Sequence, residues 1–137
     1  MRRSKARGYR QIMGSIGSNL QEVKDRISRA CKAAARDENS VTLLAVSKTF
    51  GADAVRDAHA AGQRAFGENY VQEALAKIES LVDLRAQLQW HLIGPLQSNK
   101  TRPVAEAFDW VHSVDRLKIA QRLAEQRPAW LPPLQLC

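Results

Sequence analysis

Hydrophobic residues follow two different spacings along this chain, and the two alternate. Apolar positions recur at helical spacing over residues 19–36, 52–61, 70–84, 96–108 and 115–127. Between these segments stand short apolar runs at residues 41–47, 64–66, 89–93 and 110–114, with the start of another at 134–137. Runs this short predict buried strands, whereas the helical spacing predicts amphipathic helices. Strands that alternate with helices form parallel βα units with right-handed crossovers.

The first apolar run has the clearest pattern in the chain. Residues 41–47 are almost wholly apolar and β-branched, and Lys48 stands at their end. We expect this strand to be buried on both faces, as in parallel sheets, and the lysine to lie where α/β folds place their chemistry. A partly desolvated lysine can act as a nucleophile toward a carbonyl group. The alternative is a solvated lysine that merely ends the strand.

Four βα units and the beginning of a fifth strand fit two α/β architectures. One is a small doubly wound sheet, and the other is about half of an eight-unit barrel. A single glycine, Gly51, follows the first predicted strand, so the pattern gives no support to a Gly-rich dinucleotide or P-loop phosphate site. The pattern alone leaves the two architectures open.

The composition is that of one soluble globular domain. The chain has 137 residues, of which 45% are hydrophobic and 26% charged. No apolar run approaches the ~20 residues of a membrane-spanning helix, so we expect no membrane partner. Cys31 and Cys137 have neither a metal-ligand spacing nor the pattern of a disulfide framework. These features predict a protein of the reducing cytoplasm.

The formal net charge of +7 is concentrated at the N-terminus. Five basic residues precede residue 13 with no acidic residue among them: Arg2, Arg3, Lys5, Arg7 and Arg10. We therefore expect a disordered basic extension over residues 1–12 and a folded domain over residues 13–137. Because Tyr9 is the one aromatic residue among these charges, we expect no nucleic-acid partner.

Polar residues stand at or after the end of each complete predicted strand: Lys48, Glu68 and Asn69, His91, and His112 and Ser113. Since parallel strands bring their carboxyl ends to one edge, these side chains should gather at one mouth. An imine-forming lysine needs an aldehyde and groups that hold it. Asn69 can donate to and accept from an aromatic hydroxyl, and His91 can stack on or bond a flat ring.

Plainer roles remain open for the same residues. His91 alternates with apolar neighbours, as a packing histidine in a strand would, and Asn69 follows Gly67 as a turn residue or helix cap would. The three histidines and their acidic neighbours lack ligand spacing, so we expect no metal site.

Three motifs together resemble one family. They are LAVSK at residues 44–48, FGENYVQE at 66–73 and WHLIGPLQSNK at 90–100. In this order and spacing they closely resemble the pyridoxal phosphate homeostasis protein family, also called the YggS/PROSC family. The likeness runs from about residue 14 to the end of the chain.

The resemblance implies a fold, a cofactor and site residues. The fold would be an alanine-racemase-like, fold-type III (β/α)8 barrel with parallel strands, of which residues 13–137 form the N-terminal half. The cofactor would be pyridoxal 5'-phosphate (PLP), with Lys48 as the lysine of the internal aldimine and Asn69 and His91 near the cofactor ring. Family members bind and supply PLP in intracellular PLP homeostasis and have no established catalytic turnover.

The chain departs from the family in length, because it ends as the fifth strand begins. The family's phosphate-binding loops follow the last strands of the barrel, so we expect this chain by itself to bind PLP weakly or not at all. The alternatives are therefore a truncated fragment with impaired binding and a PLP-dependent, racemase-like enzyme. For the full-length protein we expect a monomer, and for a fragment we expect self-association through the open strand edge.

Overall fold

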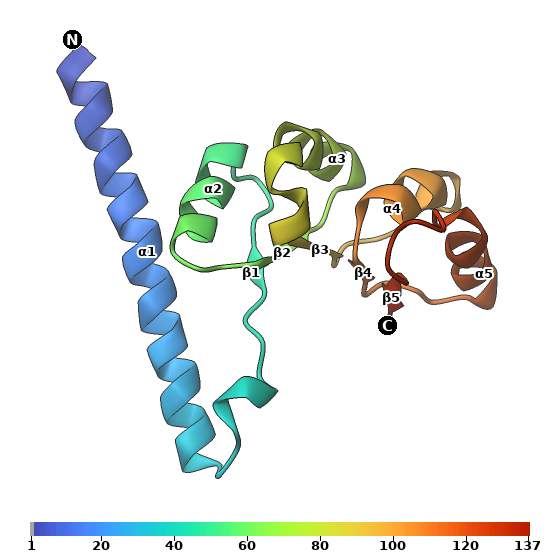
Figure 1. Ribbon diagram of the computed structural model, residues 1–137, viewed down its shortest axis with the longest axis horizontal. Helices are drawn as coiled ribbons and strands as arrows, with labels where there is room; N and C mark the ends of the chain where they lie inside the picture. The colour runs from blue at the N-terminus through green and yellow to red at the C-terminus, as the bar shows by residue number, and fades with distance from the viewer. Residues whose placement is uncertain (1) are drawn as a thin grey trace. The chain divides into compact units, whose positions relative to one another are not determined.

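The computed structural model describes the backbone of residues 2–137 and the side chains of residues 15–137. Its elements, in chain order, are α1 (Arg2–Ala33), η1 (Glu38–Ser40), β1 (Ala45–Val46), α2 (Ala52–Ala60), β2 (Ala65–Glu68), α3 (Val71–Ser80), η2 (Val82–Gln87), β3 (Gln89–Leu92), η3 (Ser98–Lys100), α4 (Thr101–Ala107), β4 (Trp110–Val111), α5 (Leu117–Gln126) and β5 (Gln135–Leu136) (Figure 1). Helices and strands alternate from β1 onward, as the hydrophobic pattern predicts.

The chain divides into two compact units. The first comprises residues 1–44 and 53–63 and contains α1, η1 and α2. Within it, Gln63 Nε2 donates a hydrogen bond of 2.8 Å to the carbonyl oxygen of Leu43. The helix α1 begins well before residue 19, where the apolar spacing starts. The predicted basic extension over residues 1–12 lies outside the residues whose side chains are described, and it stays a prediction.

The second unit comprises residues 45–52 and 64–137 and contains the sheet. All five strands are parallel and follow one another in the order β1-β2-β3-β4-β5. A doubly wound sheet reverses direction after its first strands, whereas a (β/α) barrel adds each new strand on the same side. The observed order therefore selects the barrel architecture from the two that the pattern left open.

Three helices, α3, α4 and α5, lie along one side of the strands of this unit (Figure 1). The core between helices and sheet consists of fully buried apolar residues, among them Phe66, Trp90, Leu92, Val104, Phe108, Val111, Ile119 and Leu123. Strand residues that pair across the parallel ladder point to the same face, and alternate residues point to opposite faces. Phe66 pairs with Trp90, and their ring centroids are 5.8 Å apart. One face of the sheet thus builds the core with the helices.

The first strand differs from its prediction in length and burial. The apolar run 41–47 contributes only Ala45–Val46 to the ladder, and the side chain of Val46 is 48% exposed. The expectation of a strand buried on both faces was wrong. Val46 pairs with Gly67, which pairs with His91, so these residues share the face opposite the core. The apolar run is therefore longer than the paired strand that it contains.

Charged residues tie together the loops at the amino ends of β3 and β4. Both guanidinium nitrogens of Arg85 bond the Asp109 carboxylate at 2.9 Å, and Asp109 also accepts a hydrogen bond of 2.8 Å from the backbone N–H of Trp90. Arg127 donates to the carbonyl oxygens of Ala105 and Phe108 at 2.8 and 2.6 Å. Bidentate, charge-assisted bonds of this kind fix geometry as well as add stability.

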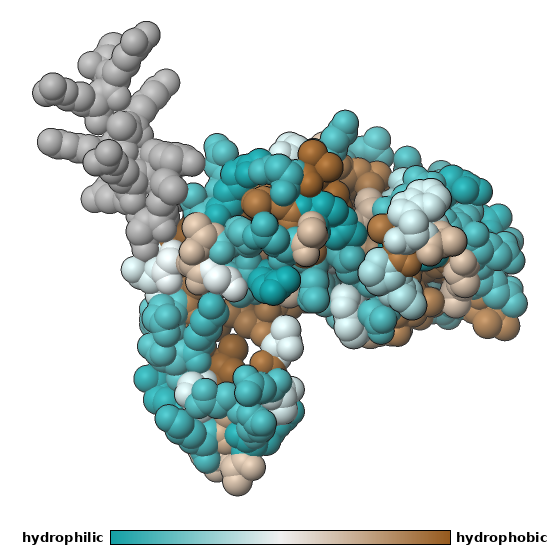
Figure 2. Space-filling model, in the orientation of Figure 1, coloured by the Kyte–Doolittle hydropathy of each residue, from teal (hydrophilic) through white to brown (hydrophobic). Residues whose placement is uncertain are grey.

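The surface of this unit mixes apolar and polar side chains (Figure 2). Large exposed hydrophobic residues include Val82, Leu117 and Trp130. None of the helices in the described part of the chain is long and apolar enough to cross a membrane.

Candidate functional site

Lys48 lies in a turn that begins where β1 ends. The backbone N–H of Ser47 bonds the carbonyl oxygen of Gly67 at 2.9 Å, and the N–H of Phe50 closes the turn by bonding the Ser47 carbonyl at 3.1 Å. Thr49 has a φ angle of 68°, which is unfavourable for a β-branched residue. The Lys48 side chain is exposed. The turn thus presents the lysine at the carboxyl end of the first strand, as predicted, in a backbone conformation that its neighbours must hold.

A buried ion pair lies beneath this turn. Glu68, the last residue of β2, is fully buried and pairs with Lys77 of α3, whose side chain is 5% exposed. Lys77 Nζ also donates to the carbonyl oxygen of Ser47 at 2.7 Å, and Ser47 Oγ donates to the Glu68 carboxylate at 3.0 Å. A buried carboxylate needs such partners, because an unpaired charge in the interior is costly.

Glu68 lies elsewhere than predicted, and Lys77 was not among the predicted residues. Glu68 was expected at the mouth with the other polar strand ends, but its carboxylate points to α3. A signal for Lys77 was present, because it shares the buried stripe of α3 with Ala74 and Ile78 at the i, i+3, i+4 spacing. A lysine within an apolar stripe indicates a buried acidic partner.

Asn69 follows β2, and its backbone packs closely against Gly94 in the segment after β3. A Cβ atom added to Gly94 would lie 2.0 Å from the carbonyl oxygen of Asn69, so only glycine permits this close approach. The side-chain Oδ1 of Asn69 is buried and has no hydrogen-bond partner among the described residues. Buried polar atoms are normally paired, so an unpaired one in a fixed position indicates capacity to bind a ligand.

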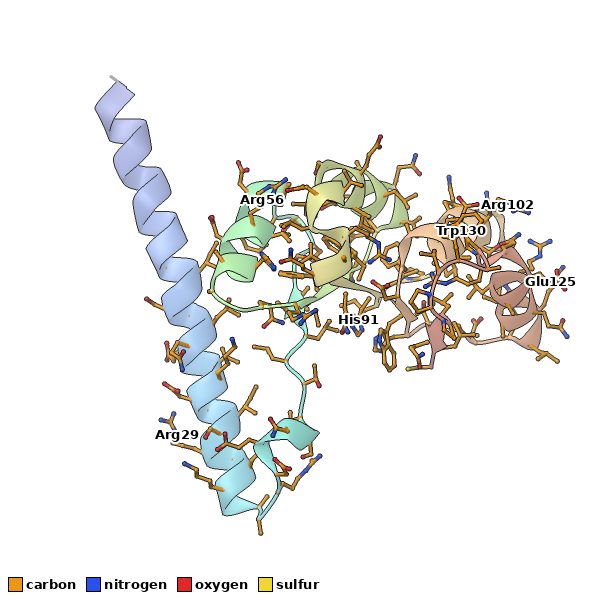
Figure 3. The ribbon with its side chains drawn as sticks, viewed as in Figure 1. Arg29, Arg56, His91, Arg102, Glu125 and Trp130 are labelled. Atoms are coloured by element: carbon orange, nitrogen blue, oxygen red, sulfur yellow. The ribbon has the colours of Figure 1, made fainter. Side chains whose placement is uncertain are left out.

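His91 lies on the face of the sheet away from α3 (Figure 3) and belongs to a stack of three aromatic rings. Its ring is nearly parallel to that of Trp110, at an interplanar angle of 6° and a centroid distance of 5.3 Å. His91 Nδ1 lies 2.9 Å from His112 Nε2, which makes a hydrogen bond whose donor depends on the tautomers. The other nitrogen, Nε2 of His91, is buried without a partner among the described residues.

Burial, and then the neighbouring His112, lower the pKa of His91 from 6.5 to about 4, although Asp109 acts in the opposite direction. The ring is therefore neutral at pH 7, and Nε2 can donate or accept according to the tautomer. Packing and binding, the two roles left open for this histidine, thus fall on different parts of the ring: Nδ1 is satisfied within the protein, whereas Nε2 is available.

These residues make up a candidate site toward the carboxyl ends of β1, β2 and β3. Lys48, Asn69 and His91 come from three neighbouring strands, and Ser113 Oγ after β4 is likewise buried and unpaired. The described residues contain no group of three His, Cys, Asp or Glu side chains arranged to hold a metal ion. The exposed amine of Lys48, the unpaired atoms of Asn69 and His91 and the stacked rings could together bind a flat, polar organic molecule.

A sequential parallel sheet with helices along one side is the arrangement of (β/α) barrels. The family model for the alanine racemase N-terminal domain matches residues 18–135, and the chain belongs to this family. The predicted fold, the N-terminal half of such a barrel, is confirmed.

Individual relatives narrow the comparison. The chain is 66% identical over 125 residues to the pyridoxal phosphate homeostasis protein of Pseudomonas aeruginosa, covering 91% of this chain and 54% of that protein. It is 56% identical to the protein of the same name from Escherichia coli, covering 90% of this chain and 53% of the relative. The resemblance inferred from the three motifs is thereby confirmed. The chain spans about half the length of these curated relatives.

Two solved structures are also similar to this chain in sequence and in fold. PipY of Synechococcus elongatus, described with PLP bound, is 52% identical with a TM-score of 0.62, covering 73% of this chain and 47% of PipY. A protein of unknown function from Bifidobacterium adolescentis is 34% identical with a TM-score of 0.78, covering 85% of this chain and 51% of that structure.

Proposed function

We propose that this protein binds PLP at the carboxyl ends of β1–β3 and serves intracellular PLP homeostasis in the cytoplasm without catalytic turnover. One observation carries the proposal. Oδ1 of Asn69, just after β2, and Nε2 of His91, in β3, are buried without a hydrogen-bond partner among the described residues, and β2 pairs with the strand that leads to Lys48. The names of the relatives and the PLP described in PipY support the same ligand.

The residues present fit the ring and the aldehyde of PLP. Lys48 would carry the covalent link, since an uncharged amine attacks an aldehyde carbon. Asn69 would accept a hydrogen bond from a ring hydroxyl, and His91 would bond a polar atom of the ring or lie against it. When bound, the cofactor supplies an electrophilic carbonyl and an electron-withdrawing ring. The Trp110–His112 stack keeps His91 in one orientation, which reduces the entropic cost of binding.

The phosphate of PLP needs binding groups other than those that hold the ring and the aldehyde. The resemblance places the family's phosphate-binding loops after the last strands, and the chain spans about half the length of its curated relatives. Phosphate contacts contribute much of the anchoring of such a cofactor, so we propose that this chain by itself binds PLP weakly.

The experiment is an absorbance titration with PLP, followed by borohydride reduction and peptide mapping. We expect the reduced pyridoxyl group mainly on Lys48, and the corresponding absorbance band to disappear in Lys48→Ala. The matched control is Lys118→Ala, which removes an exposed lysine of α5 and should leave both signals unchanged. Equal labelling of many lysines in the wild-type chain would refute the proposal.

A test for enzyme activity separates the racemase-like alternative. The PLP-loaded protein is incubated with L-alanine, and D-alanine is followed by chiral chromatography. Turnover that depends on Lys48 would replace the homeostasis proposal with an enzymatic one.

A further inference from the structure

We propose that Glu73 and Lys77 of α3 are positioning residues that hold the backbone on both sides of Lys48. The inference rests on the proposed function, because it assigns a purpose to the turn that carries the cofactor lysine. Both side chains act through the main chain of the turn.

The contacts fall on the two peptide groups that flank the Lys48 Cα atom. The preceding peptide group contributes the Ser47 carbonyl oxygen, which accepts a hydrogen bond from Lys77 Nζ at 2.7 Å. The following one contributes the Thr49 N–H, which donates to Glu73 Oε1 at 2.9 Å. Each side of the lysine is thus anchored to the same helix by a charged group, and bonds of this kind are about twice as strong as neutral ones.

The two anchors are coupled to each other and to the sheet. Glu73 Oε1 lies 3.8 Å from Lys77 Nζ, four residues further along α3. Lys77 is also paired with the fully buried Glu68, so its ammonium group has little freedom to move. The backbone around Lys48 is therefore held by α3, and α3 is in turn held by Glu68 at the end of β2. Asn69 follows this same strand.

The backbone conformation shows why anchors are needed here. Thr49 has a φ of 68°, a region that β-branched residues rarely occupy and that costs free energy. Such a conformation persists only where surrounding contacts impose it. The Glu73 carboxylate holds the N–H of this very residue. Without it, the turn would relax and the direction of the Lys48 side chain would change.

The first test uses the chain without cofactor and measures amide hydrogen exchange of Thr49 by NMR. We expect Glu73→Ala to raise the exchange rate of this amide about tenfold or more, because a hydrogen bond to a charged acceptor is lost. Glu73→Gln keeps an acceptor oxygen and should restore much of the protection. The matched control is Glu79→Ala, which removes an exposed carboxylate from the same helix and should leave Thr49 unchanged. Unchanged exchange in Glu73→Ala would overturn the proposal.

The second test measures where PLP attaches. We expect Glu73→Ala to lower the share of pyridoxyl label on Lys48 severalfold relative to the other lysines, in conditions in which the variant stays folded. Lys77→Met alone would leave Glu68 unpaired and endanger folding, so Lys77→Met is combined with Glu68→Gln. This double variant should show the same redistribution of label if it folds, and Glu73→Ala decides the matter if it does not.

The proposed function and the anchoring of the turn can be refuted independently of each other. A wild-type chain without preference for Lys48 refutes the proposed function, whereas the exchange of Thr49 decides the anchoring without any cofactor. A Glu73→Ala variant with faster exchange but unchanged labelling at Lys48 would refute the positioning role and leave the proposed function intact.

Discussion

The close approach of Gly94 to Asn69 makes Gly94→Ala the sharpest structural test of the site. The added Cβ atom would lie 2.0 Å from the Asn69 carbonyl oxygen and 2.7 Å from its Cα atom. Contacts of real Cβ atoms essentially never fall below 3.0 Å, so the backbone of one segment must move by at least the difference between 3.0 and 2.0 Å. Overpacking against side chains costs about 1–3 kcal/mol. Because both segments here are backbone, we expect a loss of about 3 kcal/mol.

The assay is urea unfolding followed by tryptophan fluorescence, since Trp90 is fully buried in the folded chain. With a urea dependence of about 1–3 kcal/mol per molar, the midpoint should fall by about 1 M or more. The control is Gly17→Ala in α1, whose added Cβ meets only Ala61 Cβ at an ordinary 3.9 Å. It should raise the midpoint, because alanine favours a helix over glycine by about 1 kcal/mol. A loss below about 1 kcal/mol in Gly94→Ala would show that the segment after β3 does not approach Asn69 as described.

Three further predictions concern charge. In an NMR titration the ring of His91 should have a pKa of about 4, and His112→Gln should raise that pKa because it removes the electrostatic effect by which His112 lowers it. Because the folded pKa of His91 is depressed below 6.5, its contribution to stability is present above that pH and is lost as the pH falls toward 4. Urea unfolding should show a loss of up to about 3 kcal/mol over this window that is missing in His91→Phe. Asp109→Ala should lower the free energy of unfolding by about 2–3 kcal/mol, because it leaves the half-buried Arg85 without its bidentate partner. A double-mutant cycle with Arg85→Ala that yields no coupling would contradict this last prediction.

The alternation of apolar patterns was enough to locate all five strands, but not to set their lengths. The run 41–47 contains a two-residue strand, so the apolar pattern alone does not show how many of its residues pair. Strand order, which separates a barrel from a doubly wound sheet, came from tertiary pairing. Nothing in the local pattern distinguishes the two orders.

Some features of the candidate site could be predicted from the sequence, and others could not. Lys48, Asn69 and His91 could be proposed because polar residues at the ends of parallel strands lie on one edge. The bond between His91 and His112 depends on the register of β3 against β4, which the sequence does not display. Lys77 acts on Lys48 from a helix that begins 23 residues later, where Val71 follows Tyr70. Such support can be inferred only once the helix has been packed against the sheet.

The alternation of side chains along β2 has a consequence for how these proteins can change during evolution. Glu68 pairs with Lys77 of α3, whereas Oδ1 of the next residue, Asn69, has no hydrogen-bond partner among the described residues. A change at Glu68 is tolerable only with a compensating change at Lys77, so these two positions should covary among relatives. Asn69 has no such partner within the described residues and should vary with the ligand instead. Two adjacent positions would then belong to independent groups of covarying residues, and the binding preference could drift while the support beneath Lys48 stays unchanged.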